Sequence, residues 1–218
     1  YYFGEVARIR EKTSGLMHPL TAKAYNNLAV LFMEKALWDT ALVLNRKAYE
    51  IRLAKLPPNH PDIALSLNNM ANVYRAKGDH ETALDYHQKA LNMRLALYGT
   101  KDHTDIAMSY TNIGVLLREI GRYQEGRNYF LAALDILIKT LGEESPYTAA
   151  AYNNAGAAYD DAGDYNNCLK YLKKALSLRL HRGTEAPGIP SSYNNIGTIY
   201  KKRGDIDLAL AYYRISKE

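Results

Sequence analysis

The chain has 218 residues, of which 47% are hydrophobic, so it can bury a core, and its formal net charge at pH 7 is +5. No stretch approaches the ~18 consecutive apolar residues of a membrane-spanning helix, and a single cysteine, Cys168, excludes an internal disulfide. We therefore expect a cytoplasmic protein without membrane insertion. The modest basic excess favours acidic partners, although it is equally typical of an ordinary solvated surface.

The first residues already follow a helical pattern. The opening YYFGEVARIREK has no initiating methionine and no signal peptide, so we interpret the chain as a fragment of a longer protein. Residues 1–15 match the second helix of a repeat and the turn that follows it.

One motif then recurs as YNNLAVLF, LNNMANVY, YTNIGVLL, YNNAGAAY and YNNIGTIY, with starts 41 to 43 residues apart. In the second copy, Leu67, Met70 and Tyr74 follow the i, i+3, i+7 spacing of one helix face. Gly78-Asp79 breaks this helix, and a second helix follows with Ala83 and Ala90 on its apolar face. The pattern therefore predicts that each repeat consists of two helices joined by a turn.

A small residue recurs at one position of every first helix, as Ala29, Ala71, Gly114, Gly156 and Gly197. Glycine inside a helix costs ~1 kcal/mol relative to alanine, so its recurrence predicts that the two helices of a repeat approach closely here. Cys168 stands in the second helix where alanine is usual, which predicts a small core residue rather than a redox centre.

These offsets resemble the tetratricopeptide repeat pattern. We predict an all-α fold, a right-handed superhelical solenoid of helix-turn-helix repeats that forms a single domain over residues 1–218. The expected boundaries are a half repeat over 1–20, full repeats over 21–61, 62–103, 104–146 and 147–189, and a partial repeat over 190–218.

Three longer segments resemble the repeats of kinesin light chains and their relatives, namely REKTSGLMHPLTAKAYNNLAVLF, PPNHPDIALSLNNMANVYRAKGDHETALDYHQKAL and LGEESPYTAAAYNNAGAAYDDAGDYNNCLKYLKKAL. The His-Pro turn of that family survives only at His18-Pro19 and His60-Pro61. The resemblance implies a cargo or peptide adaptor whose first helices hold a peptide in a concave groove. It also implies cytoskeletal association, a kinesin heavy chain as a partner outside this fragment, and homo-oligomerisation through flanking regions.

One asparagine of the motif falls opposite the apolar face. At ~100° per residue, Asn27 lies ~200° from Tyr25 around the helix axis. An asparagine is disfavoured inside a helix, whereas its amide offers donors and an acceptor to a peptide backbone. We therefore predict a peptide-binding ladder, with the alternative that each asparagine ties its helix to the next one; the equivalent residues are Asn69, Asn112, Asn154 and Asn195.

Two further columns share this side of the first helices. One contains Asn72, and the other contains Arg75, Arg118, Asp160 and Lys201. Arginine binds carboxylates through two parallel hydrogen bonds, so we predict that Asn72, Arg75, Arg118 and Lys201 join the asparagines in binding a short, partly acidic peptide. The alternative is ordinary solvated charge at helix C-termini, which the helix dipole favours.

Two other columns favour structural roles. The flanking asparagines precede the predicted binding column, and Thr111 interrupts them; they are Asn26, Asn68, Asn153 and Asn194. Arg52, Arg94 and Arg179 share one position of the second helices, and Leu137 replaces them in the third repeat. Packing or pairing between repeats is the preferred interpretation of these arginines.

The sequence lacks the marks of an enzyme. No Cys/His pair has metal-ligand spacing, no Gly-rich phosphate loop is present, and no paired acid and base residues face each other. We expect no catalytic residue, metal or cofactor, and no nucleic-acid partner. Two alternatives to a cargo adaptor remain: a co-chaperone module that clamps a C-terminal carboxylate through Asn69, Arg75, Asn112 and Arg118, or a regulatory or self-assembling arm of a larger enzyme or scaffold.

Overall fold

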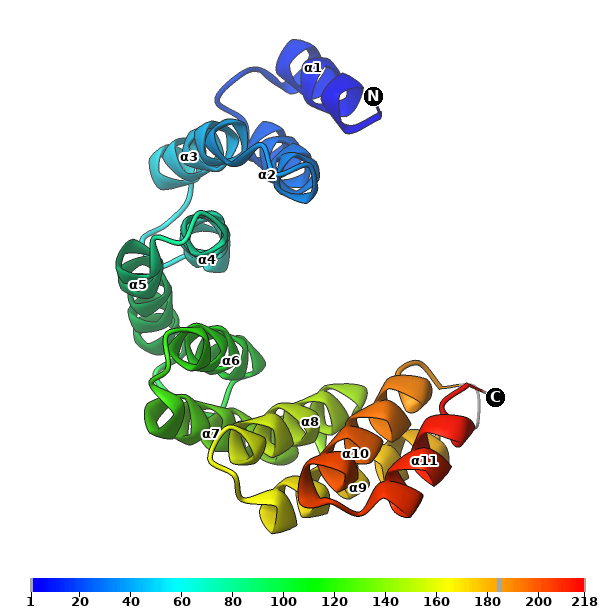
Figure 1. Ribbon diagram of the computed structural model, residues 1–218. Coiled ribbons are helices and arrows are strands. Elements are labelled where there is room, and N and C mark those ends of the chain that lie inside the picture. The colour runs from blue at the N-terminus through cyan, green and yellow to red at the C-terminus, as the bar shows by residue number, and fades with distance from the viewer. Residues whose placement is uncertain (1, 184–185, 218) are drawn as a thin grey trace. The chain divides into compact units, whose positions relative to one another are not determined.

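The computed structural model describes residues 2–183 and 186–217, and within these ranges the chain folds into helices without a β-strand (Figure 1). The helices are α1 (Tyr2–Ser14), α2 (Pro19–Glu34), α3 (Trp38–Lys55), α4 (Pro61–Ala76), α5 (His80–Tyr98), α6 (Thr104–Glu119), α7 (Tyr123–Leu141), α8 (Pro146–Asp160), α9 (Tyr165–His181), α10 (Ile189–Arg203) and α11 (Ile206–Ile215). The all-helical prediction is confirmed.

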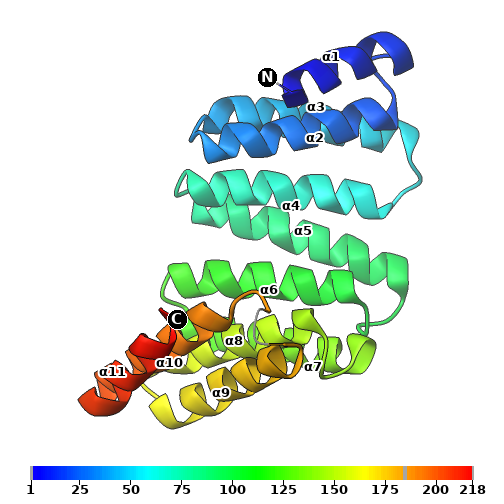
Figure 2. The same ribbon diagram turned by 90° about the vertical axis from the view of Figure 1, so that its right-hand side faces the viewer.

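The chain divides into two compact units, unit 1 over Tyr1–Lys101 and unit 2 over Asp102–Glu218. In unit 1, α2 packs on α3 and α4 on α5, while α1 covers α2 and α3 also packs on α4 (Figure 2). In unit 2, the pairs α6–α7, α8–α9 and α10–α11 are joined by α7 on α8 and α9 on α10. Each unit is thus a stack of two-helix repeats, as the sequence predicts.

Histidines begin three of the first helices. His18, His60 and His103 are the N-cap residues of α2, α4 and α6, and each Nδ1 accepts a hydrogen bond of 3.1 Å from the backbone N–H two residues later. Ser145 does the same for α8 through its hydroxyl oxygen, at 3.3 Å. Such caps satisfy N–H groups that have no partner inside the helix. The sequence placed these histidines at the turns but did not reveal this role.

The small residues lie where the two helices of a repeat touch. Ala29 and Ala71 are fully buried. A Cβ atom at Gly156 would lie 3.0 Å from Cγ and Cδ2 of Leu172 on α9 and 3.3 Å from the backbone oxygen of Cys168. The predicted close approach is therefore present, and Cys168 is a fully buried core residue, as predicted.

Replacing Gly156 by valine should lower the free energy of unfolding by about 2–3 kcal/mol, because the added carbons meet α9 and overpack the core. Ala150→Val on the exposed side of α8 is the matched control and should cost no more than ~0.5 kcal/mol. Urea unfolding followed by circular dichroism measures both. Equal losses in the two variants would show that the helix contact at Gly156 is not tight.

One core position of the second helices is polar in unit 1 and apolar in unit 2. Asn45 and His87 are buried at one position of α3 and α5, and Phe130 and Leu172 occupy the equivalent position of α7 and α9. Asn45 accepts a hydrogen bond of 2.7 Å from Nδ2 of Asn26, and His87 Nδ1 lies 2.6 Å from Oδ1 of Asn68. Buried polar groups of this kind need partners, so the first helices of unit 1 supply asparagines to them.

Candidate peptide-binding site

The predicted binding asparagines all lie on first helices, and their environments differ. Asn27 on α2 is exposed, whereas Asn69 on α4, Asn112 on α6, Asn154 on α8 and Asn195 on α10 are half-buried. Asn72 and Arg75 are also half-buried on α4, in unit 1. Half-burial leaves an amide partly accessible to a ligand while the helix holds it in place.

Asn112 and Asn154 share one pocket of unit 2, with a volume of about 400 Å³, which we call the apolar pocket. Its other lining residues are Thr104, Met108, Thr111, Leu137, Leu141, Tyr147, Ala150 and Ala151. Met108 and Tyr147 are 52% and 69% exposed. The pocket therefore offers two amides beside an accessible apolar surface, a combination that is typical of ligand sites.

The apolar pocket exists because three polar residues that are bonded to one another in the first repeat have apolar or shorter equivalents at this place. In the first repeat, Arg52 Nη1 donates hydrogen bonds to Asn26 Oδ1 and to Ser66 Oγ on the next helix. The equivalent residues are Thr111 and Leu137 in the third repeat and Ala151 at the start of the fourth, and all three line the pocket. Shorter and apolar side chains leave space where the other repeats hold an arginine.

A second pocket of unit 2, about 270 Å³ in volume, contains Asn195 and is called here the amide pocket. Asn195 Nδ2 on α10 donates a hydrogen bond of 3.1 Å to Asn153 Oδ1 on α8. Asn195 therefore fits the alternative interpretation of the asparagine column, in which the side chain links two neighbouring first helices. The remaining lining residues are Arg118, Ala157, Asp160, Cys168, Leu172, Thr198 and Ile199.

Two basic residues on the first helices of unit 2, Arg118 and Lys202, meet acidic partners one repeat away. Arg118 on α6 pairs with Asp161 at the end of α8 through two hydrogen bonds, of which Nη2–Oδ1 is 3.0 Å long. Lys202 on α10 pairs with Asp160 at 2.6 and 2.7 Å. These hydrogen bonds raise the pKa of both cations. Lys201, the predicted binding residue, is exposed beside Lys202.

The structural columns behave as predicted where the structure shows their contacts. Asn26 and Asn68 are buried and bonded within unit 1. Arg179 Nη1 donates to the backbone oxygen of Gly188, at 3.1 Å, and to Ser192 Oγ, so it joins α9 to the start of α10. Arg52 likewise links its repeat to the next through Ser66. The links are hydrogen bonds to neutral groups rather than ion pairs.

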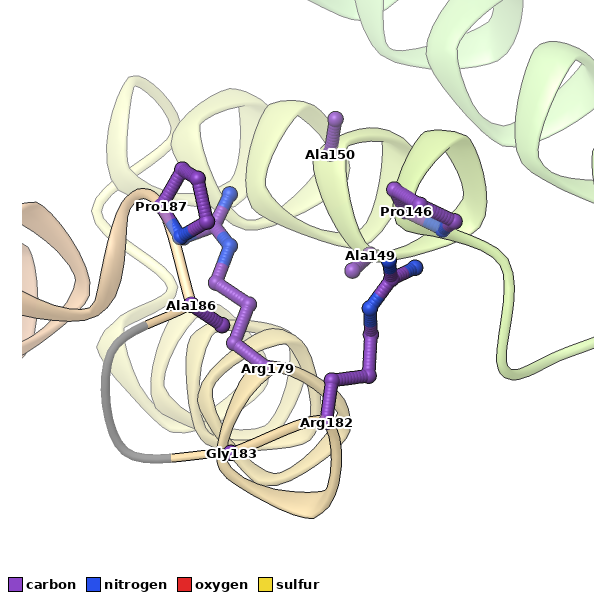
Figure 3. Close-up of a pocket in the computed structure, with 8 residues that line it drawn as sticks. All are labelled: Pro146, Ala149, Ala150, Arg179, Arg182, Gly183, Ala186 and Pro187. Atoms are coloured by element: carbon purple, nitrogen blue, oxygen red, sulfur yellow. The ribbon is translucent and has the colours of Figure 1, made fainter.

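The largest of the described pockets, about 800 Å³, lies at the ends of α8 and α9 and is lined by Arg179 and Arg182 (Figure 3). None of the predicted binding residues lines it.

Within the described ranges, no three His, Cys, Asp or Glu side chains are grouped so that they could hold a metal ion. None of the helices in these ranges combines the length and apolarity that crossing a bilayer requires.

Met108, Leu141 and Tyr147 line the apolar pocket but were not among the predicted site residues. Met108 and Tyr147 are large apolar side chains on the solvent side of first helices, which is itself a signal of a contact surface. A second signal is the change of Asn, Arg and Ser to Thr111, Leu137 and Ala151 around one repeat junction, and these three changes together indicate a pocket.

Known proteins share both the repeat and the fold. The tetratricopeptide repeat sequence model matches residues 20–96, 105–181 and 190–214. No curated protein matches the sequence. BtubC (BKLC) from P. vanneervenii is 21% identical over 99% of this chain and 85% of its own, with a TM-score of 0.82.

Two further solved structures are similar. A protein of Podosopora anserina with nearly identical kinesin light chain TPR-like repeats is 19% identical over 92% of this chain and 96% of its own, with a TM-score of 0.77. A Rap protein complexed with competence and sporulation factor is 20% identical over 90% of this chain and 53% of its own, with a TM-score of 0.73. At these identities the likeness shows a common fold.

Proposed function

The chain belongs to the tetratricopeptide repeat family, and on this basis we propose that it is a peptide-binding adaptor of kinesin light chain-like type that holds a short segment of a partner protein on the first helices of unit 2. Tetratricopeptide repeats in general are non-catalytic scaffolds that use extended surfaces to bind protein partners. The adaptor would connect this partner to a motor or scaffold.

The observation that carries this proposal is the apolar pocket with its two half-buried amides. Asn112 and Asn154 come from neighbouring first helices and line one pocket, so they can bind successive peptide groups of an extended backbone. Met108 and Tyr147 can cover one apolar side chain of the same segment. Backbone recognition by amides and one buried side chain together support micromolar binding.

The charges of unit 2 modify the expected ligand. Arg118 is already engaged by Asp161, so an acidic ligand side chain would compete with this pair. An acidic residue in the peptide therefore adds less affinity than it would if Arg118 had no carboxylate partner within the protein. The same pairing disfavours a carboxylate clamp, because Arg118 is one of the cations that the clamp would need.

The test is a titration of a peptide selected from a random peptide library on the 218-residue protein. Asn112→Ala and Asn154→Ala should each weaken binding by about five- to tenfold, because each removes hydrogen bonds worth about 1 kcal/mol. Asn128→Ala, an exposed asparagine on the second helix α7, is the control and should leave the affinity unchanged.

The role of charge is tested with the same peptide carrying one Glu or one Gln. Asp161→Asn should release Arg118 and increase the preference for the Glu peptide. Unchanged affinity in both amide variants would exclude this binding site. A preference for free over amidated peptide C-termini would instead indicate a carboxylate clamp.

A further inference from the structure

A separate groove lies on the second helices of unit 2, on α7 and α9, and is closed at its base by Tyr152 of α8. Its volume is about 640 Å³, and we call it the lysine groove. The predicted peptide-binding residues lie on first helices, and none of them lines this groove. Its lining residues are Leu134, Ile138, Tyr152, Lys170, Tyr171, Lys173, Lys174 and Ser177.

The floor of the lysine groove is apolar. Leu134 is buried, and Ile138 remains 36% exposed beside it. The rings of Tyr152 and Tyr171 lie 6.0 Å apart between their centroids. The Tyr152 hydroxyl donates a hydrogen bond of 2.8 Å to Glu143, so this polar end already has a partner. The floor therefore suits an apolar side chain.

The rim of the groove is basic because α9 contains no acidic residue between Tyr165 and His181. Lys170, Lys173 and Lys174 are spaced by three and four residues, and like charges at these spacings destabilise a helix. The fold does not require three lysines here: at these positions the second repeat has Asp85, Gln88 and Lys89, and the third has Asn128, Leu131 and Ala132.

The charges around the groove leave a positive excess. Lys174 lies 3.1 Å from Glu143, and Asp135 on α7 is paired with Lys139 at 2.6 Å. Lys173 lies over the ring of Tyr200, 5.4 Å from its centroid. Lys170 is exposed and has no acidic side chain within ion-pair distance among the residues that the structure describes. Lys170 and Lys173 are thus not matched by carboxylates.

We propose that the lysine groove binds an acidic amphipathic segment of a partner protein, with one apolar side chain on Leu134, Ile138 and Tyr171 and carboxylates facing Lys170 and Lys173. The stems of lysine side chains extend an apolar floor while their charged ends remain in water, so one surface can bind both parts of such a segment. Complementary charge selects the partner and speeds its association. This surface and the first-helix site would let unit 2 hold two partners.

A protein segment fits this groove better than an anionic membrane does. A lipid surface contacts protruding basic side chains, whereas here the apolar groups lie at the base of a groove between two helices. Leu134 at that base is only 5% exposed and is reached by a side chain that inserts rather than by a planar surface.

The experiment uses a fluorescent synthetic peptide with leucines at i, i+3, i+4 and i+7 and glutamates on both sides, titrated into the 218-residue protein. A peptide with glutamine in place of glutamate is the charge control. Lys170→Glu/Lys173→Glu should weaken binding by at least about tenfold, and Ile138→Asp should weaken it similarly. Arg46→Glu/Lys47→Glu changes net charge equally on α3 and should leave binding within about twofold of the unsubstituted protein.

Binding of the glutamate peptide that is lost only in the groove variants supports the proposal, provided that circular dichroism shows all variants folded. Three results would overturn it. These are no binding to the unsubstituted protein, equal binding of the glutamine peptide, and sedimentation with phosphatidylserine-containing vesicles without peptide binding. Substitutions of Asn112 and Asn154 leave this groove intact, so failure here is distinguishable from failure of the first-helix site.

Discussion

Replacing Arg52 by leucine should lower the free energy of unfolding of unit 1 by about 2–4 kcal/mol, because buried acceptors lose their donor. Arg52 is 3% exposed, and its Nη1 donates to Asn26 Oδ1, to Ser66 Oγ at 2.6 Å and to the backbone oxygen of Asp62 at 3.1 Å. These contacts connect α3 to α2 and to the following helix α4. Their loss affects the core of one repeat and its junction with the next.

The third repeat shows how the loss can be compensated. Thr111 and Leu137 of this repeat and Ala151 at the start of the fourth occupy the three equivalent positions, without the arginine or the serine. Replacing a whole buried polar group by apolar residues is far less costly than removing one member. Asn26 also donates to buried Asn45, so this residue has to be replaced as well. Asn26→Thr/Asn45→Leu/Arg52→Leu/Ser66→Ala should therefore recover at least half of the stability that Arg52→Leu loses.

Urea unfolding followed by fluorescence measures this effect in unit 1, because Trp38 on α3 is the only tryptophan of the chain. Arg46→Leu, an exposed arginine on the same helix, is the control and should change stability by less than ~0.5 kcal/mol. If the quadruple variant is no more stable than Arg52→Leu, the loss of stability does not come from the buried acceptors that the arginine leaves without a donor.

The repeat architecture was predictable because most of the contacts that define it lie within one repeat. The motif spacing, the apolar faces and the small-residue column from Ala29 to Gly197 each predicted a two-helix unit, and all describe contacts within one repeat. The same reasoning placed Cys168 in the core. When the packing and hydrogen-bond partners of a side chain lie within one repeat, one copy of the motif is enough to predict its role.

The candidate site was less predictable because its charges pair between repeats. Arg118 and Asp161 are 43 residues apart, and Lys202 and Asp160 are 42 apart. Columns of equivalent positions place these residues in an exposed stripe but do not show which members of neighbouring columns meet. That depends on the rotation between successive repeats, which the period of the sequence does not specify. The apolar pocket depends on the same junction.

Lowering the pH from 6.5 to about 4 should destabilise unit 1 by about 3 kcal/mol through His87 alone. His87 on α5 is 1% exposed. Burial, followed by the positive charges of Arg75 on α4 and Arg94 on α5, lowers its pKa from 6.5 to about 4. The folded state therefore binds fewer protons at this histidine than the unfolded state does. Its contribution to stability is complete above pH 6.5 and is lost as the pH falls toward 4.

The hydrogen bond of His87 indicates where the proton would go. Nδ1 lies 2.6 Å from Asn68 Oδ1 and donates to this oxygen in the neutral ring. Nε2 is buried, with no hydrogen-bond partner among the described residues. An added proton on Nε2 would place an uncompensated charge in the core, which is costly. Neutral His87 is thus compatible with the fold, and charged His87 is not.

Replacing His87 by leucine, the residue that the fourth repeat has at this position as Leu172, should remove this pH dependence. Asn68 loses its partner, so the variant should start less stable at neutral pH, by about 1–2 kcal/mol. The difference in stability between the two proteins should then shrink or reverse as the pH falls, in urea unfolding monitored through Trp38. His181→Leu, at an exposed position of α9, should keep the full dependence. A slope that His87→Leu leaves unaltered would mean that carboxylates, rather than this imidazole, govern the acid sensitivity of unit 1.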